Sequence, residues 1–191
     1  MPARLALFAS GSGSNAEVII RHFENNSQIE VALVLTNNAA AGVIERAQKL
    51  EVQTKFFTRD QFRESEKILE ALRQHEITHI VLAGFLLQIP TLMIQEYPSR
   101  IINIHPSLLP KFGGKGMYGM KVHEAVKQSG ETETGITIHE VNEHYDDGRV
   151  LFQAKCNVEG TDTPEQIARN VQALEHHHFP RVIEKWIAST K

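Results

Sequence analysis

The sequence predicts an α/β fold in which helices flank a mostly parallel sheet. Short apolar segments alternate with longer amphipathic segments through the first half of the chain, and this alternation is typical of βαβ units. The second half contains two extended segments joined by a short polar turn, which predicts an antiparallel strand pair. A long amphipathic segment follows them. We therefore expect a single domain over residues 1–191, with an antiparallel C-terminal strand pair and a long C-terminal helix.

The first half supplies the parallel strands and their connecting helices. The apolar side chains Phe62, Ile68, Leu69 and Leu72, for example, can share one helical face. The predicted strands cover residues 4–9, 30–35, 52–57, 78–83 and 100–104, and the predicted helices cover 15–25, 40–50, 59–75 and 90–97.

The second half begins with a glycine-rich loop. The last helix has a defined start, because Thr163 can cap it and Pro164 suits its first turn. The elements predicted here are the loop 111–120, a helix over 122–128, strands over 135–141 and 149–156, and a helix over 163–186.

Composition excludes several broad classes. The 191 residues are 41% hydrophobic and 23% charged, with a formal net charge of -3, which is ordinary for one globular domain and does not favour general nucleic-acid binding. The single cysteine, Cys156, cannot form an internal disulfide, so we expect a reducing cytoplasm. No segment has the length of a membrane span or the pattern of a signal peptide. We expect no membrane association, and either a monomer or a homodimer.

The segment 10-SGSGSN-15 follows the first strand and opens the first helix. Glycines there let backbone amides approach an anion, and the helix N-terminus adds donors and a favourable dipole. The segment is not a Walker A loop. It matches the dinucleotide fingerprint only with Ala16 at the third glycine, and no acidic residue ends the second strand at 36–38. Phosphate binding and a simple capped turn both fit.

A polar set stands at the end of the fifth strand. Asn103 and His105 point to the same side by the two-residue period of a strand. An amide and a protonated imidazole can together stabilise a developing oxyanion, and the carboxylate of Asp146 is a candidate partner for the imidazole. The alternative is structural, because Asp146, Asp147 and Gly148 also suit an ordinary turn.

These residues resemble the folate-dependent formyltransferase family. The resemblance rests on 103-NIHPSLLP-110, 135-GITIH-139 and Asp146-x-Gly148, and it extends from about residue 4 to 186. It implies a Rossmann-like sheet, the formyl donor 10-formyltetrahydrofolate, and Asn103, His105 and Asp146 as catalytic residues without a metal. The loop 10–15, 83-AGF-85 and 175-EHHHFP-180 are similar to the members that formylate glycinamide ribonucleotide in purine biosynthesis.

The resemblance also implies binding roles. The phosphate and ribose or glycinamide arm of the acceptor would contact Gly11, Ser12, Gly13, Ser14, Asn15 and Glu175. The pterin pocket would be lined by Leu86, Leu87, Gln88, Ile89, Val141, Asn142, Glu143, His144 and Tyr145. Residues 1–100 would form a phosphate- and nucleotide-binding half, and residues 101–191 a catalytic and folate-binding half.

The chain departs from the commonest family pattern at four places. Leu87 replaces an arginine, Asp147 and Arg149 replace a glycine and a proline, and the loop 111–120 is longer and richer in glycine. Two alternatives remain. The first, which the resemblance also implies, is another formyltransferase or a hydrolase that uses 10-formyltetrahydrofolate. The second is a non-catalytic nucleotide-binding module, which would use the loop 11–15.

Overall fold

One seven-stranded sheet runs through the protein. The computed structural model describes residues 2–190, and the strand order is β3-β2-β1-β4-β5-β6-β7. The first five strands are parallel, and β6 is antiparallel to both β5 and β7. This arrangement confirms the predicted fold class. The strands are β1 Ala3–Phe8, β2 Ile29–Thr36, β3 Thr54–Phe56, β4 His79–Leu82, β5 Ile101–His105, β6 Glu133–Glu140 and β7 Val150–Asn157.

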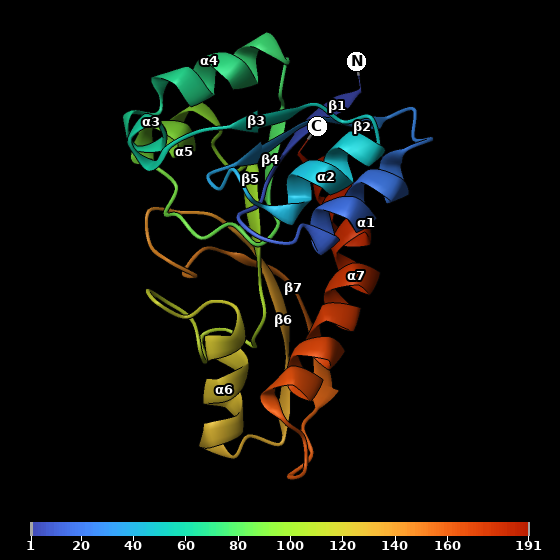
Figure 1. Cartoon of the computed structure of the whole chain (residues 1–191), viewed down its shortest axis with the longest axis vertical. Coiled ribbons are helices and arrows are strands. Elements are labelled where there is room, and N and C mark those ends of the chain that lie inside the picture. Colours follow the sequence, from blue (N-terminus) through green and yellow to red (C-terminus); the bar gives the residue numbers. More distant parts are fainter. Residues whose placement is uncertain (1, 191) are drawn as a thin grey trace.

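Helices cover both faces of the sheet (Figure 1). Helices α1, α2 and α7 lie over one face, α3, α4 and α5 lie over the other, and α6 stands beside the antiparallel strands. The helices are α1 Ser14–Phe23, α2 Gly42–Lys49, α3 Arg59–Glu64, α4 Glu66–Gln74, α5 Thr91–Glu96, α6 Met120–Ser129 and α7 Pro164–Ser189.

Two hydrophobic clusters form the core, one on each face of the sheet. Leu5 and Leu7 of β1 belong to the cluster under α1 and α7, whereas Ala6 and Phe8 belong to the cluster under α4 and α5. All four are fully buried. A strand buried on both faces reads as a continuous apolar run, which is why the sequence alone located β1.

Two predicted elements were wrong in extent. The helix expected over 59–75 is two helices separated by Ser65, which has φ of 63° and whose hydroxyl donates to the Phe62 carbonyl. Thr58 and Gln61 complete a capping box at the start of α3. The third strand has only three residues, Thr54–Phe56, and pairs at the sheet edge with β2. Thr163 caps α7 as predicted, and Gln166 completes its capping box.

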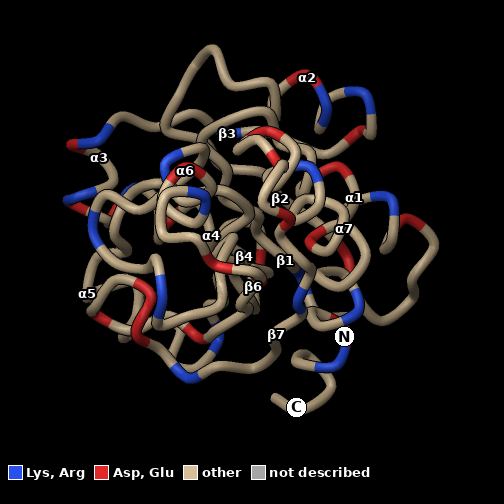
Figure 2. The backbone as a smooth tube through the Cα atoms, turned by 90° about the horizontal axis from the view of Figure 1, so that it is seen from below, with Lys and Arg blue, Asp and Glu red and all other residues tan. Residues whose placement is uncertain are grey.

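Charged residues of both signs are interspersed around the chain (Figure 2). None of the helices within residues 2–190 combines the length and apolar character needed to cross a membrane.

The topology creates a crevice at the carboxyl ends of the central strands. β1 lies between β2 and β4, so the order of connection reverses beside it. In open α/β sheets, such a reversal leaves space for ligands beyond the strand ends. The backbone N–H of Ser10, just after β1, donates to the carbonyl of Gly84, just after β4.

Candidate active site

A cavity of about 870 Å³ opens at these strand ends. It is continuous from the loop after β1, past the end of β5, to the segments that follow β4 and β6. Among the residues that line it are Gly11–Asn15, Asn103, His105, Asp146 and Glu175. Residues that are far apart in sequence and were singled out for different roles therefore share one space.

The loop Gly11–Asn15 at one end of the cavity, which we call the anion loop, has the glycine conformation and helix start that the predicted phosphate site requires. Gly13 has φ of 77°, and a Cβ there would overlap the side chain of Val43, so only glycine fits without strain. Helix α1 begins at the next residue. No described residue accepts a hydrogen bond from the backbone N–H of Ser12 or Gly13. Free amides at a helix N-terminus form a site for phosphate or carboxylate.

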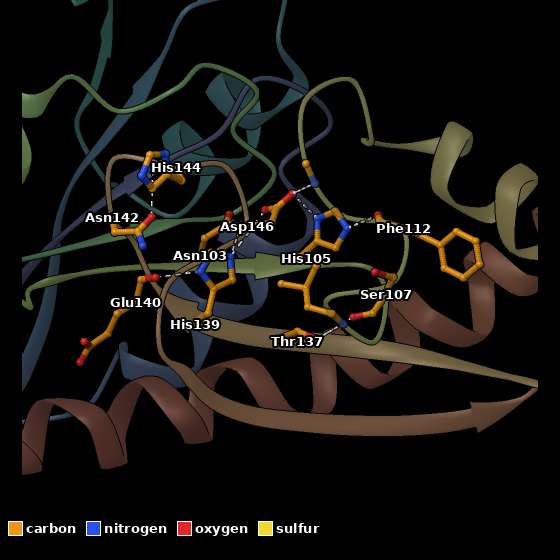
Figure 3. Close-up of polar contacts among 12 residues, drawn as sticks. Asn103, His105, Ser107, Phe112, Thr137, His139, Glu140, Asn142, His144 and Asp146 are labelled. Carbon is orange, nitrogen blue, oxygen red and sulfur yellow. Dashed lines mark hydrogen bonds and ion pairs between the residues drawn. The ribbon is translucent and has the colours of Figure 1, made fainter.

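Strand β5 carries Asn103 and His105 into the middle of the cavity. Both line it, although His105 is only 4% exposed. The strand register places Asn103 opposite His139 of β6, and the Asn103 amide nitrogen lies 3.1 Å from His139 Nε2. The Nδ1 of His139 contacts the Glu140 carbonyl at 2.8 Å and must donate to it. In the neutral ring, Nε2 therefore accepts from Asn103 and fixes the direction of its amide group (Figure 3).

His105 is held between a carbonyl and a carboxylate. Its Nε2 donates to the carbonyl oxygen of Phe112 at 2.8 Å, because that oxygen can only accept. Its Nδ1 lies 3.5 Å from Asp146 Oδ2. Burial lowers the pKa of His105 more than Asp146 and the Phe112 carbonyl raise it. The lowered pKa favours the neutral imidazole of His105, which has a lone pair on Nδ1. The sequence led us to expect the protonated imidazole, and His105 reaches that state only by gaining a proton at Nδ1.

Asp146 is fixed from several sides. Its Oδ2 accepts from the backbone N–H of Gly114 at 2.9 Å, and its Oδ1 lies 3.6 Å from His139 Nε2. Burial raises the pKa of Asp146, but His139 and His105 in their protonated forms, together with the Gly114 N–H, hold it below its usual value, so the carboxyl is charged. Gly148 is required two residues later, because a Cβ there would overlap the Glu140 carbonyl. This close approach explains the Asp146-x-Gly148 spacing.

Glu175 of α7 faces the anion loop. Its Oε2 accepts from the Asn15 side-chain amide at 2.8 Å. The surrounding protein raises the pKa of Glu175, and the Asn15 contact opposes that rise. The two side chains form a polar pair in the lining of the cavity.

The predicted folate residues divide into three groups. Leu86, Leu87 and Tyr145 line the main cavity, and Leu86 and Tyr145 are 47% and 38% exposed. An adjoining cavity of about 490 Å³ shares Leu87 and Tyr145 with it. The second group lines only this adjoining cavity: Gln88, Ile89 and Glu143. The third group lines neither cavity: Val141, Asn142 and His144.

The two segments of the folate set are joined to one another. The side-chain amide of Gln88 donates to the Glu143 carbonyl at 2.8 Å. The backbone N–H of Leu86 in turn donates to the hydroxyl of Ser10, next to the anion loop.

Several wall residues were not in the predicted site. Met117 and Tyr118 of the glycine-rich loop line the cavity, as does Arg59. His139 contacts Asn103. Only the β5–β6 register would have identified His139 as the partner of Asn103, and register depends on tertiary structure.

The rest of the molecule contains a further cavity. A separate cavity of about 410 Å³ lies between β7 and the end of α7, and contains none of the predicted site residues. Within residues 2–190, no group of three or more His, Cys, Asp or Glu side chains is arranged to hold a metal ion.

Known proteins resemble this chain over nearly its whole length. The family model described as formyl transferase matches residues 3–183. A chloroplastic phosphoribosylglycinamide formyltransferase of Arabidopsis thaliana is 40% identical over 94% of this chain, and one of Vigna unguiculata is 39% identical over 95%. The chain spans 64% and 60% of the lengths of these two relatives. The phosphoribosylglycinamide formyltransferase of Bacillus subtilis is 36% identical over 95% of this chain and 93% of its own length.

Solved structures agree with the sequence comparisons. The crystal structure of phosphoribosylglycinamide formyltransferase from Bacillus halodurans has a TM-score of 0.88 and 33% identity, and the match covers 98% of this chain and 97% of that one. The enzyme from Anaplasma phagocytophilum also gives 0.88, with 32% identity, over 96% and 86% of the two chains. The chain belongs to the formyl transferase family.

Proposed function

We propose that this protein transfers the formyl group of 10-formyltetrahydrofolate to the amine of glycinamide ribonucleotide. The products are formylglycinamide ribonucleotide and tetrahydrofolate, in purine biosynthesis. The main support for the proposal is that one cavity of about 870 Å³ contains the anion loop, the polar residues Asn103, His105 and Asp146, and an apolar wall. A phosphorylated acceptor and a flat aromatic donor need these features in this order. The relatives named for this activity support the assignment.

Each end of the cavity suits one substrate. The free amides of the loop 11–15 suit the phosphate of the acceptor, and Glu175 stands where its ribose or glycinamide arm would pass. Leu86, Leu87 and Tyr145 offer apolar surface to the pterin ring, while backbone groups near them can bind its polar edge. The formyl carbon would then lie beside Asn103 and His105.

The proposed reaction is direct attack of the amine on the formyl carbon. The carbonyl oxygen becomes an oxyanion. One N–H of the Asn103 side-chain amide contacts His139, and the other N–H can donate to this oxyanion. Such a donor contributes about 3–4 kcal/mol in a preorganised site. The amine must lose a proton, and Nδ1 of neutral His105 can receive it, directly or through a water held by Asp146. The charge of Asp146 stabilises the resulting imidazolium, whose proton can then assist the oxyanion and pass to the departing folate nitrogen.

Hydrolysis of the formyl donor is the second candidate. The same three residues would serve it, with water as the nucleophile. The anion loop favours the transferase, because hydrolysis of the formyl donor involves no phosphorylated acceptor that the loop could bind.

A turnover experiment separates these functions. Purified protein is mixed with 10-formyltetrahydrofolate, with and without glycinamide ribonucleotide, and loss of the formyl group is followed. We expect turnover only with the ribonucleotide, and its loss in His105→Ala. Equal turnover without the acceptor would instead identify a hydrolase. The absence of turnover in both mixtures would contradict either formyl-transfer reaction.

The division into two functional halves, at about residue 100, also remains a proposal. The cavity takes residues from both, since Leu86 precedes that boundary and Glu175 follows it. A cytoplasmic location is likewise a prediction from the single cysteine, and two plant relatives are described as chloroplastic.

A further inference from the structure

Helix α2 donates two hydrogen bonds to backbone carbonyls of the anion loop. The backbone N–H of Val43 donates to the Gly11 carbonyl at 3.2 Å. The side-chain Nε of Arg46, one turn further along α2, donates to the Ser12 carbonyl at 2.9 Å. Two successive carbonyls of the loop are therefore bound to the same helix.

These two contacts determine where the loop amides point. In a trans peptide, the C=O and N–H groups point in opposite directions. With the Gly11 carbonyl directed at α2, the N–H of Ser12 points away from that helix. With the Ser12 carbonyl directed at Arg46, the N–H of Gly13 does the same. Successive amides directed to one side form an anion-binding concavity.

Arg46 is itself held in place by an acidic residue of α1. Its Nη1 pairs with Glu17 Oε2, and Arg21 contacts the other oxygen of the same carboxylate. The contact with Arg46, followed by that with Arg21, lowers the pKa of Glu17. Arg46 thus bridges the first turn of α1 to the loop that precedes it, whereas Arg21 pairs with Glu17 without contacting the loop.

We propose that Arg46 is a positioning residue that preorganises the phosphate site of this protein. It does not touch the anion. It keeps the Ser12 carbonyl directed at α2 and away from the cavity, so that the Ser12–Gly13 peptide presents its N–H to the cavity. Without Arg46, that carbonyl is free to turn inward, where its oxygen would repel a phosphate. The proposal rests on the proposed function only in the identity of the phosphorylated substrate.

Binding of inorganic phosphate tests the proposal separately from catalysis. Calorimetric titration of Arg46→Met, which keeps a good helix former in α2 but has no N–H donor for the Ser12 carbonyl, is compared with the wild type. A hydrogen bond to a charged group contributes about 1.5–3 kcal/mol, so loss of one oriented amide predicts about 10- to 100-fold weaker binding. Arg21→Met is the matched control, and its phosphate affinity should stay within about threefold of the wild type.

A double variant separates orientation from charge. Removing Arg46 also leaves Glu17 less neutralised near the phosphate. In Arg46→Met with Glu17→Gln that charge is gone, yet the Ser12 carbonyl is still unbound, so binding should remain weak. Recovery of wild-type affinity in the double variant would overturn the proposal, as would unchanged affinity in Arg46→Met. If Arg46→Met does not fold, Arg46→Ala gives the same test, because alanine has no donor and the highest helix propensity.

Steady-state kinetics then connect the site to the reaction. In Arg46→Met, we expect the KM for glycinamide ribonucleotide to rise about 10-fold or more, while the KM for 10-formyltetrahydrofolate changes less than about twofold. An equal rise in both constants would contradict a role confined to the phosphate loop. A wild-type protein that binds phosphate in an Arg46-dependent manner but transfers no formyl group would contradict the proposed function alone.

Discussion

Replacing Asp146 by asparagine tests the electrostatic core of the candidate site. The change removes one negative charge and keeps the shape of the side chain. An amide oxygen can still accept from the Gly114 N–H, which now holds Oδ2 at 2.9 Å. What is lost is the charge 3.5 Å from His105 Nδ1.

The magnitude follows from that distance. A carboxylate and an imidazolium 3.5 Å apart attract one another by about 5 kcal/mol at an effective dielectric constant of about 20. The amide dipole of asparagine recovers part of this energy, so we expect the barrier to rise by about 4 kcal/mol. At 1.36 kcal/mol for each factor of ten, kcat should fall by about three orders of magnitude. Both KM values should change far less, because Asp146 acts on the proton transfer.

The assay follows deformylation of 10-formyltetrahydrofolate at saturating glycinamide ribonucleotide. Asp147→Asn is the matched control, since Asp147 is the exposed neighbour and contacts none of these groups. Circular dichroism should show that both variants unfold near the wild-type temperature. The reasoning is refuted if Asp146→Asn keeps more than about a tenth of the wild-type kcat, or if Asp147→Asn loses as much activity.

Three further results are expected. Asn103→Ala should lower kcat by about 100- to 1000-fold with little change in either KM, because it removes one oxyanion donor; steady-state kinetics that show a KM effect alone would contradict this role. Gly13→Ala should lower the free energy of unfolding by about 1–3 kcal/mol, measured with urea, because its Cβ would overlap Val43 at a positive φ. Gly11→Ala, whose Cβ would meet nothing within 4 Å, should be tolerated. Burial lowers the pKa of His79 to about 4 from 6.5. Between these two pH values the unfolded chain therefore binds more protons than the folded chain, and the free energy of unfolding decreases as the pH falls, by about 2 kcal/mol between pH 7 and pH 5. In His79→Gln, denaturant titrations at these two pH values should show a correspondingly smaller difference in the free energy of unfolding.

The sequence alone was enough to identify the elements whose patterns are local. Strand β1 is apolar on both faces, helix α7 begins with a threonine cap and a proline, and the loop 10–15 contains the glycines that its conformation requires. Asn103 and His105 were assigned to one side of β5 because that relation depends only on the two-residue period of a strand. The long match at 103–110 then indicated a family, and with it a role for Asp146.

Tertiary structure decided the features that depend on distant contacts. The break at Ser65 has no proline or glycine to announce it, and its φ of 63° is maintained by a buried hydroxyl and the packing of α3 and α4. The partnership of Asn103 with His139 depends on strand register. The contacts of Phe112 with His105 and of Gly114 with Asp146 use main-chain atoms, which every residue possesses and no residue type reveals. Arg46 reads as a solvated residue of an amphipathic helix, and only the fold brings it to the carbonyl of Ser12, 34 residues away.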